Sequence, residues 1–282
     1  MKMTKLLSIG LAVGLLATLS AKAQTNEPGN SALHEKLQAL VLQVQTKAKD
    51  GKTNETDLAD ELKTLDNLIA DEKGAKSDEA AQLVFMKAQL YLEVINNTDK
   101  GVTIIKQIKT DYPDTFYGTN VDKILDGIAK QAAAKKVQEG LTVGTAFPDF
   151  AVKGLDGKDL SVGALKGKVV LVDFWATWCP PCRAELPNVI ATYKKHHGEG
   201  FEIIGVSLDS ERDKLDEFLK QQDGMTWPQF YDGKAWSNEL AVKYGVEGIP
   251  FAILVGADGK IIGKELRGEE LEAAVAKALT TK

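Results

Sequence analysis

The only two cysteines of this 282-residue chain, Cys179 and Cys182, lie three positions apart in the motif Trp-Cys-Pro-Pro-Cys. Two thiols at this spacing can form a structural disulfide, supply half of a metal site, reduce a peroxide or exchange electrons with other thiols. A staple across so short a loop would remove little entropy from the unfolded chain, so it would add little stability. Reactive chemistry is the stronger expectation.

The histidines do not complete a metal site in the sequence. Structural zinc normally has four ligands, and one cysteine pair supplies two. The chain has no second pair and only three histidines, His34, His196 and His197. His196 and His197 end a predicted surface helix, so we expect both to be solvated. The sequence therefore predicts no metal site, and we expect no cofactor.

A buried strand and a helix are expected to position the two cysteines. Apart from Asp173, the run Val169–Phe174 is apolar and largely β-branched, as in a central strand that is covered on both faces. Pro180 or Pro181 suits the first turn of a helix, where a missing N–H costs nothing. Cys179 would then lie at the helix N-terminus, where the helix dipole favours a thiolate. Cys182 would lie one turn deeper and be better shielded.

The remaining pattern from about residue 141 to residue 282 predicts an α/β domain with a mixed central sheet. Hairpin turns are expected at Asp156-Gly157 and Asp258-Gly259, and another strand at Phe201–Asp209. Helical periodicity covers 185–195, 213–222, 235–244 and 269–279.

Residues 24–138 predict a separate all-α domain. Apolar residues recur at three- and four-residue spacing in five segments, separated by polar, glycine-containing breaks. The stretch Gln82–Thr115 faintly resembles one tetratricopeptide repeat, but Gln89 and Gly101 stand where its usual glycine and alanine would be. We expect a plain helical bundle, with a true repeat as the alternative.

The first 23 residues predict a cleavable signal peptide. Two lysines precede an apolar run, Leu6–Leu19, and Ala21-Lys22-Ala23 is a small-x-small cleavage site. The run is shorter than the roughly 20 residues of a spanning helix, and a retained anchor is the alternative. We expect an exported protein of the periplasm or cell envelope, without stable membrane insertion after cleavage. The net charge of −5 gives no nucleic-acid footprint.

Two motifs resemble those of a known family. The segments VDFWATWCPPCRAELP (172–187) and GVEGIPFAILV (245–255) resemble thioredoxin-fold thiol:disulfide oxidoreductases, in particular the exported TlpA/ResA-like group. The resemblance covers about half of the chain. It implies that Cys179 attacks a substrate disulfide and Cys182 resolves the mixed disulfide. It also implies a cis peptide bond before Pro250, which lets the Ile249 backbone pair with a bound substrate strand.

The resemblance also assigns flanking residues. Trp178 matches the aromatic residue beside the exposed cysteine, and with Pro180 and Pro181 it would contact substrate, whereas Trp175 is expected in the core. Two acids match different branches of the family. Asp173 matches the buried acid of thioredoxin, which can exchange a proton with Cys182.

Glu185 matches an acid near the dithiol in the ResA-like branch, and the sequence leaves open which of the two acids handles the proton. The lysine that accompanies the buried acid in thioredoxin is absent, with Gly205 or Val206 in its place. Without that partner, Asp173 is expected to be more easily protonated.

Three functions therefore compete. We expect an exported reductase of protein disulfides, since Pro180-Pro181 lacks the histidine seen between the cysteines of strongly oxidising relatives. The family implies a membrane thiol electron donor and, in several branches, apocytochrome c as substrate. The helical half could instead be a partner- or peptide-binding module with an auxiliary redox domain. A peroxiredoxin is the third possibility, but Ala176 and Val172 break the motif that family places before its reactive cysteine.

Overall fold

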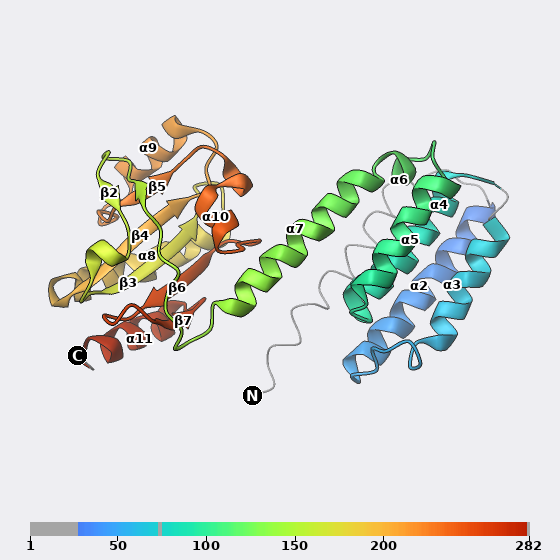
Figure 1. Ribbon diagram of the computed structural model, residues 1–282, viewed down its shortest axis with the longest axis horizontal. Helices are drawn as coiled ribbons and strands as arrows, with labels where there is room; N and C mark the ends of the chain where they lie inside the picture. Colours follow the sequence, from blue (N-terminus) through green and yellow to red (C-terminus); the bar gives the residue numbers. More distant parts are fainter. Residues whose placement is uncertain (1–27, 73–74, 281–282) are drawn as a thin grey trace. The chain divides into compact units, whose positions relative to one another are not determined.

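A computed structural model describes residues 28–72 and 75–280 of the chain, and the predicted signal peptide lies outside these ranges. The chain divides into two compact units, at residues 1–128 and 129–282 (Figure 1). The division falls inside a long helix, ten residues before the end of the predicted helical domain. Within the second unit, Gln138 donates to the carbonyl of Tyr244, which attaches the last turns of that helix to the sheet domain.

The first unit consists of helices, as the periodicity predicts. They are α2 (Pro28–Lys49), α3 (Ala59–Glu72), α4 (Asp78–Gln89), η2 (Leu90–Val94), α5 (Thr98–Asp111), α6 (Phe116–Thr119) and the beginning of α7 (Val121–Gly140). The sequence did not predict the π-helical turn η2, which continues directly from α4. Beside it, an added Cβ on Gly101 would lie 2.6 Å from Leu92 Cγ. The glycine therefore permits α5 to approach the π turn closely.

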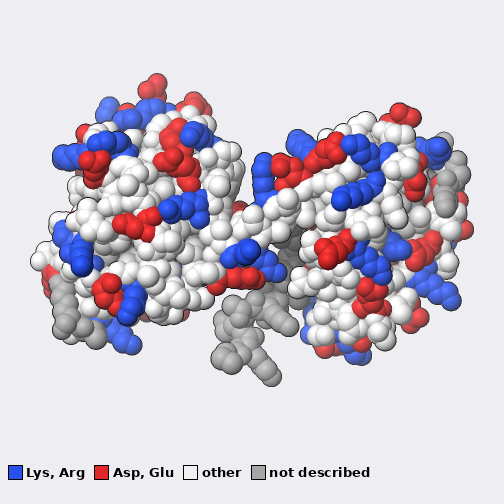
Figure 2. Space-filling view, viewed as in Figure 1, with Lys and Arg blue, Asp and Glu red and all other residues white. Residues whose placement is uncertain are grey.

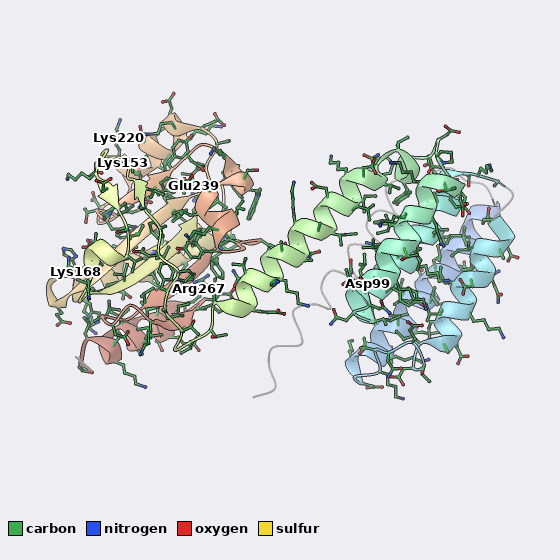
Figure 3. All side chains as sticks on the ribbon, in the orientation of Figure 1. Asp99, Lys153, Lys168, Lys220, Glu239 and Arg267 are labelled. Atoms are coloured by element: carbon green, nitrogen blue, oxygen red, sulfur yellow. A yellow bond between two sulfur atoms is a disulfide. The ribbon has the colours of Figure 1, made fainter. Side chains whose placement is uncertain are left out.

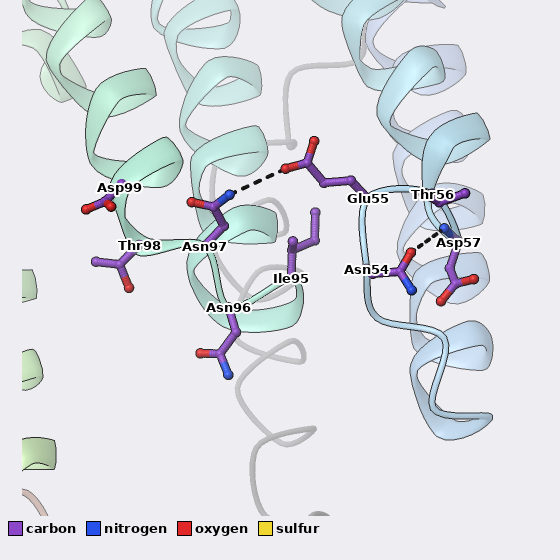
Figure 4. A pocket seen from close by; sticks show the side chains of 9 residues that line it. All are labelled: Asn54, Glu55, Thr56, Asp57, Ile95, Asn96, Asn97, Thr98 and Asp99. Atoms are coloured by element: carbon purple, nitrogen blue, oxygen red, sulfur yellow. Dashed lines mark hydrogen bonds between the residues drawn. The ribbon is translucent and has the colours of Figure 1, made fainter.

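A polar pocket lies between two loops of this unit, and its hydrogen bonds tie those loops together (Figure 4). Glu55 accepts hydrogen bonds from Asn97 Nδ2 at 3.4 Å and from Lys100 Nζ at 2.7 Å. The Lys100 ammonium is the main cause that lowers the pKa of Glu55. Because these polar groups already pair with one another, we interpret the pocket as a structural contact between the two loops.

The second unit is an α/β domain with one five-stranded mixed sheet, in the order β5-β4-β3-β6-β7. Strand β3 pairs in parallel with β4 and antiparallel with β6. The strands are β3 (Val169–Trp175), β4 (Phe201–Ser207), β5 (Gln229–Tyr231), β6 (Phe251–Val255) and β7 (Ile261–Lys264). A small antiparallel pair, β1 (Val152–Lys153) and β2 (Asp159–Leu160), precedes them. Both predicted hairpins are present.

Helices cover both faces of this sheet. Helices α8 (Pro180–His196) and α11 (Gly268–Thr280) contact each other and pack over β3 and β4. Phe174, on the opposite face of β3, packs edge-on against Tyr244 at the end of α10 (Glu239–Lys243). Every residue of β3 and β4 is buried, as the apolar runs predict for a central parallel pair.

Two elements differ from the prediction. The expected helix at 235–244 is broken into the turn η5 (Ala235–Ser237) and α10, because the buried Asn238 caps α10 through the N–H groups of Leu240 and Ala241. The sequence also missed β5, which has three residues. Helix α9 (Arg212–Gln221) connects β4 to this short strand.

The surface carries both signs of charge. On the face drawn in Figure 2, lysine and arginine alternate with aspartate and glutamate over both units. Across the described ranges, none of the helices combines the length and apolar character needed to cross a bilayer.

Candidate functional site: a dithiol facing a cis-proline

Cys179 and Cys182 are joined by a disulfide at the start of α8. Cys179 is the N-cap of this helix, and its Sγ accepts a hydrogen bond from the Cys182 N–H at 3.2 Å. Pro180 and Pro181 form the first turn, as predicted. A sulfur at this position faces the positive end of the helix dipole, which stabilises its thiolate form once the disulfide is reduced.

The prediction that Cys182 is better shielded than Cys179 is wrong for this disulfide form. The exposed fractions are 3% for Cys179 and 6% for Cys182. Both residues belong to the hydrophobic core of the second unit. In the disulfide form, therefore, burial does not separate an attacking sulfur from a resolving sulfur.

The turn that carries Cys179 is anchored by a buried acid that the sequence reading missed. Asp209 follows β4 and accepts hydrogen bonds from the Thr177 hydroxyl at 2.6 Å and from the Thr177 N–H at 3.2 Å. Leu208 also donates its N–H to the carbonyl of Trp175 at 2.8 Å. Since parallel strands end at the same edge of a sheet, an acid just after β4 was the available signal.

The loop before β6 faces the disulfide. The Ile249–Pro250 peptide bond is cis, as the resemblance implied. The carbonyl oxygen of Ile249 lies 3.7 Å from Cys179 Sγ. Both loop residues are half-buried, so their backbone borders the surface at which Cys179 would meet another molecule.

Asp173 and Glu185 line one small cavity together with Cys182 and Pro250. Asp173 is on β3 and is buried. Burial raises the pKa of its carboxyl from 3.8 to about 6, although the nearby charge of Arg267 lowers it and that of Glu185 raises it further. This direction agrees with the expectation of easier protonation. Within the described chain, no hydrogen bond to the carboxyl of Asp173 is among the causes of this shift, and the cavity-facing acid has no direct partner.

Glu185 is held differently, by two hydrogen bonds. Its Oε1 accepts from the N–H of Gly268 at 2.7 Å, and its Oε2 accepts from Asn188 Nδ2 at 3.0 Å. Gly268 begins α11, so the carboxylate caps the N-terminus of that helix. Glu185 therefore joins α8 to α11 as well as lining the cavity.

Arg267 also lines this cavity and was not identified from the sequence. Its Nη2 donates to the carbonyl of Pro250 at 2.6 Å, and its Nη1 donates to the carbonyl of Leu266 at 2.9 Å. Arg267 lies in the loop between β7 and α11 and is labelled in Figure 3. A lone arginine in a loop gives no sequence signal that it will face a buried acid.

The position of the missing lysine is occupied by another side chain. Gly205 on β4 is the register partner of Asp173. A Cβ on Gly205 would lie 2.1 Å from Gln229 Oε1. That same oxygen accepts a hydrogen bond from the indole N–H of Trp175 at 3.1 Å. Trp175 is buried, as predicted, and the glutamine carboxamide fills the space above Gly205.

Two exposed tryptophans stand near the disulfide. Trp178, just before Cys179, is 49% exposed, and Trp236 of η5 is 47% exposed. Their ring centroids are 6.0 Å apart. Pro180 and Pro181 are exposed as well. Trp178 was identified from the sequence, whereas Trp236 lies 58 positions away and had no motif to mark it.

The expectation for His196 is wrong. His196 is buried, and its ring nitrogens lie 2.7 Å from Glu199 Oε2 and 3.1 Å from Glu272 Oε1. It is the last residue of α8, where α11 covers it. His197 is about half exposed, as expected. In the part of the chain that the structure describes, no group of three or more His, Cys, Asp or Glu residues is arranged to hold a metal.

A disulfide at a helix N-terminus after a central strand, opposite a cis-proline, defines a thioredoxin-fold thiol–disulfide oxidoreductase. The family model described as Redoxin matches residues 142–280. The thiol–disulfide oxidoreductase ResA of Bacillus thuringiensis subsp. konkukian is 35% identical over 133 residues, which cover 47% of this chain and 74% of that protein. The chain therefore belongs to the family of ResA thiol–disulfide oxidoreductases, with a Redoxin domain in its C-terminal half.

Further relatives match the same half of the chain. ResA of Bacillus subtilis is 29% identical over 138 residues, which cover 49% of this chain and 74% of that protein. The solved thioredoxin domain of a thiol–disulfide oxidoreductase from Bacteroides vulgatus is 36% identical, covers 49% of this chain and 97% of that chain, and has a TM-score of 0.44.

Proposed function

We propose that the protein is an exported reductase of protein disulfides that works by dithiol exchange through Cys179 and Cys182. The observation that carries this proposal is the position of Cys179. Its Sγ accepts the Cys182 N–H at the start of α8 and lies 3.7 Å from the carbonyl of Ile249. A helix N-terminus favours the thiolate, which is the attacking species in thiol–disulfide exchange.

The reaction moves two electrons from the enzyme dithiol to the substrate disulfide. The Cys179 thiolate attacks one substrate sulfur, forms a mixed disulfide and releases the other substrate sulfur as a thiolate. Cys182 then loses its proton and attacks Cys179 Sγ. This second step forms the Cys179–Cys182 disulfide and releases the remaining substrate sulfur. A thiol donor, in this proposal a membrane dithiol protein, reduces the enzyme again.

We assign the proton of Cys182 to Asp173 rather than to Glu185. Both carboxyls line the cavity that Cys182 borders. Burial brings the pKa of Asp173 to about 6, where a carboxyl can both take and return a proton near neutral pH. Glu185 uses its oxygens to accept hydrogen bonds from Gly268 and Asn188. Its proposed role is to hold α8 against α11 and to add negative charge beside Asp173.

The proposed substrate surface consists of exposed and half-buried residues around Cys179. The Ile249 backbone, beside the cis bond to Pro250, would pair with an extended substrate segment. The indole of Trp178 and the rings of Pro180 and Pro181 would contact substrate side chains. These groups surround a disulfide that is itself buried, so a substrate strand must lie close against them to bring its own sulfur to Cys179.

Thiol-exchange assays with the single-cysteine variants test this proposal. The wild-type protein should reduce insulin and glutathione disulfide, and Cys179→Ser should abolish both reactions. Cys182→Ser should retain the first attack and accumulate a mixed disulfide on Cys179. Wild-type turnover equal to that of Cys179→Ser would refute dithiol exchange, and peroxide consumption without disulfide reduction would favour the peroxidase alternative.

Direction and substrate need their own measurements. A reductase should equilibrate with glutathione at a potential well below the roughly −200 mV of oxidising compartments. As one substrate class we propose apocytochrome c, tested with an oxidised Cys-x-x-Cys-His peptide against the same peptide lacking the histidine. Export is tested by the mature N-terminus of the protein recovered from cell envelopes, expected at Gln24.

An apolar pocket in the first unit favours a second candidate function, recruitment of a partner. Leucine, valine and methionine side chains of α2, α3, α4 and η2 line it, together with Glu93 of η2. Burial raises the pKa of Glu93. Val41→Lys would place a charge among these side chains. A recruiting module predicts slower turnover of the native partner with unchanged insulin reduction, whereas equal loss or no loss in both assays contradicts recruitment.

A further inference from the structure

Arg267 combines two contacts that meet at the redox site. Its Nη2 donates to the Pro250 carbonyl at 2.6 Å, so it holds the loop that carries the cis bond. It also lines the cavity shared by Asp173 and Cys182. The next residue, Gly268, donates its N–H to Glu185 at 2.7 Å. The segment Arg267–Gly268 therefore touches the cis-proline loop and Glu185 and faces Asp173.

The hydrogen bonds of Arg267 go to carbonyls rather than to carboxylates. Nη1 and Nη2 are occupied by Leu266 and Pro250, and Arg267 forms no ion pair within 4 Å of a described carboxylate. A direct bidentate pair with Asp173 would hold that acid ionised. Because neutral carbonyls hold the guanidinium, its charge acts on the Asp173 carboxyl through space, without a direct ion pair.

Three groups face Asp173 from the elements packed on β3. Cys182 and Glu185 come from α8, and Arg267 comes from the loop after β7. The charge of Glu185 opposes ionisation of Asp173, and the charge of Arg267 favours it. Gly205, on the neighbouring strand, carries no side chain. Arg267 thus supplies, from a loop, a positive charge near Asp173, where β4 has no lysine.

We propose that Arg267 is a positioning residue of the redox site, which fixes the cis-proline loop and sets the charge opposite Asp173. This inference rests on the proposed proton transfer between Cys182 and Asp173. Ionised Asp173 is required to accept that proton, so Arg267 sets the lowest pH at which resolution runs at full rate. Substitutions can distinguish the effect of the charge on Asp173 from the effect of the hydrogen bonds on the loop, because a side chain can keep the charge of arginine without its two-pronged donor shape.

Two substitutions separate them. Arg267→Gln keeps a hydrogen-bond donor and removes the charge, so the pKa of Asp173 should rise above about 6. The pH below which the reductase loses activity should move upward by the same amount. The ratio of the rate at pH 6 to the rate at pH 8 should fall, by up to about tenfold for each unit of displacement. Arg267→Lys keeps the charge and loses the second donor prong. This variant should lose activity at the same acidic pH as the wild type but have a higher KM for insulin.

Direct titration of the Asp173 carboxyl by carbon NMR in the oxidised protein measures the same displacement without catalysis. Lys260→Gln is the matched control, since it removes one positive charge from the exposed turn between β6 and β7; its profile should equal that of the wild type. An Asp173 pKa unmoved by Arg267→Gln, or an equal displacement in Arg267→Lys, would overturn the inference.

The double variant Asp173→Asn/Arg267→Gln separates the inference from the proposed function. If Arg267 acts through Asp173, the second substitution should add no further displacement of the pH limb. A further displacement would show that Arg267 acts elsewhere and overturns the inference. If Asp173→Asn alone retains the wild-type limb, the proposed proton transfer fails, whatever Arg267→Gln does to the NMR titration.

Discussion

Replacing Asp173 with asparagine should stabilise the folded sheet domain above neutral pH. The folded-state pKa of Asp173 is about 6, against 3.8 in the unfolded chain. The sign follows from the raised value: the folded state binds the proton more tightly, so this stabilising contribution is complete below pH 3.8 and is lost as the pH rises through 6. Asparagine carries no charge at any of these pH values, so the free energy of unfolding of the variant does not fall for this reason as the pH rises.

The size of the effect follows from the displacement. One pKa unit corresponds to about 1.4 kcal/mol, so the rise from 3.8 to about 6 corresponds to about 3 kcal/mol at high pH. Roughly 1 kcal/mol of this is already lost at pH 4.5, because the unfolded acid is mostly ionised there. The free-energy advantage of Asp173→Asn over the wild type should therefore grow by about 2 kcal/mol between pH 4.5 and pH 8.

Urea unfolding of the oxidised protein measures this difference. All four tryptophans, Trp175, Trp178, Trp227 and Trp236, belong to the second unit, so their fluorescence reports that unit alone. In the oxidised form the cysteines do not titrate. Asp159→Asn is the control, because its exposed ion pair predicts a change below about 1 kcal/mol. An advantage for Asp173→Asn that is the same at both pH values would refute the buried-acid reasoning.

Three other substitutions test contacts around the site. Thr177→Val removes the hydroxyl that donates to Asp209 and should cost about 1.5–3 kcal/mol in urea unfolding, with a lower rate of insulin reduction; unchanged stability would show that the anchor is dispensable. Gly205→Ala forces Gln229 to move and should cost about 1–3 kcal/mol, and a stability equal to wild type would contradict the close contact. His196→Leu removes the ring nitrogens that contact Glu199 and Glu272 and should lower the thermal midpoint by several degrees, for about 1–2 kcal/mol; no decrease would show that these contacts add no stability.

Local sequence signals predicted most of the framework. Cys179, Pro180 and Pro181 carry the helix start in one contiguous motif, and the central strands are long apolar runs. The cis bond before Pro250 was predicted by resemblance and is present. These features are set by neighbours in the chain or by a motif, so they can be read without three-dimensional contacts.

The missed residues act across long sequence separations. Asp209 reaches Thr177, and Arg267 reaches the Pro250 carbonyl, through a strand edge and a loop that only the folded sheet brings together. His196 was mistaken for a surface residue because its cover, α11, comes from the end of the chain. The short strand β5 forms because it pairs with β4 over three residues, a tertiary contact that its own sequence does not show.

The packing above Gly205 has a consequence for how such a site can change during evolution. A lysine from this strand position, as in thioredoxin, cannot enter while Gln229 fills the same space. Removing Gln229 first would leave the indole N–H of the buried Trp175 without its acceptor. Each single step is therefore costly, and the two changes must occur together. A lysine on β4 and an arginine in the loop after β7 would therefore be alternatives separated by this barrier, even though both place a cation near the same acid.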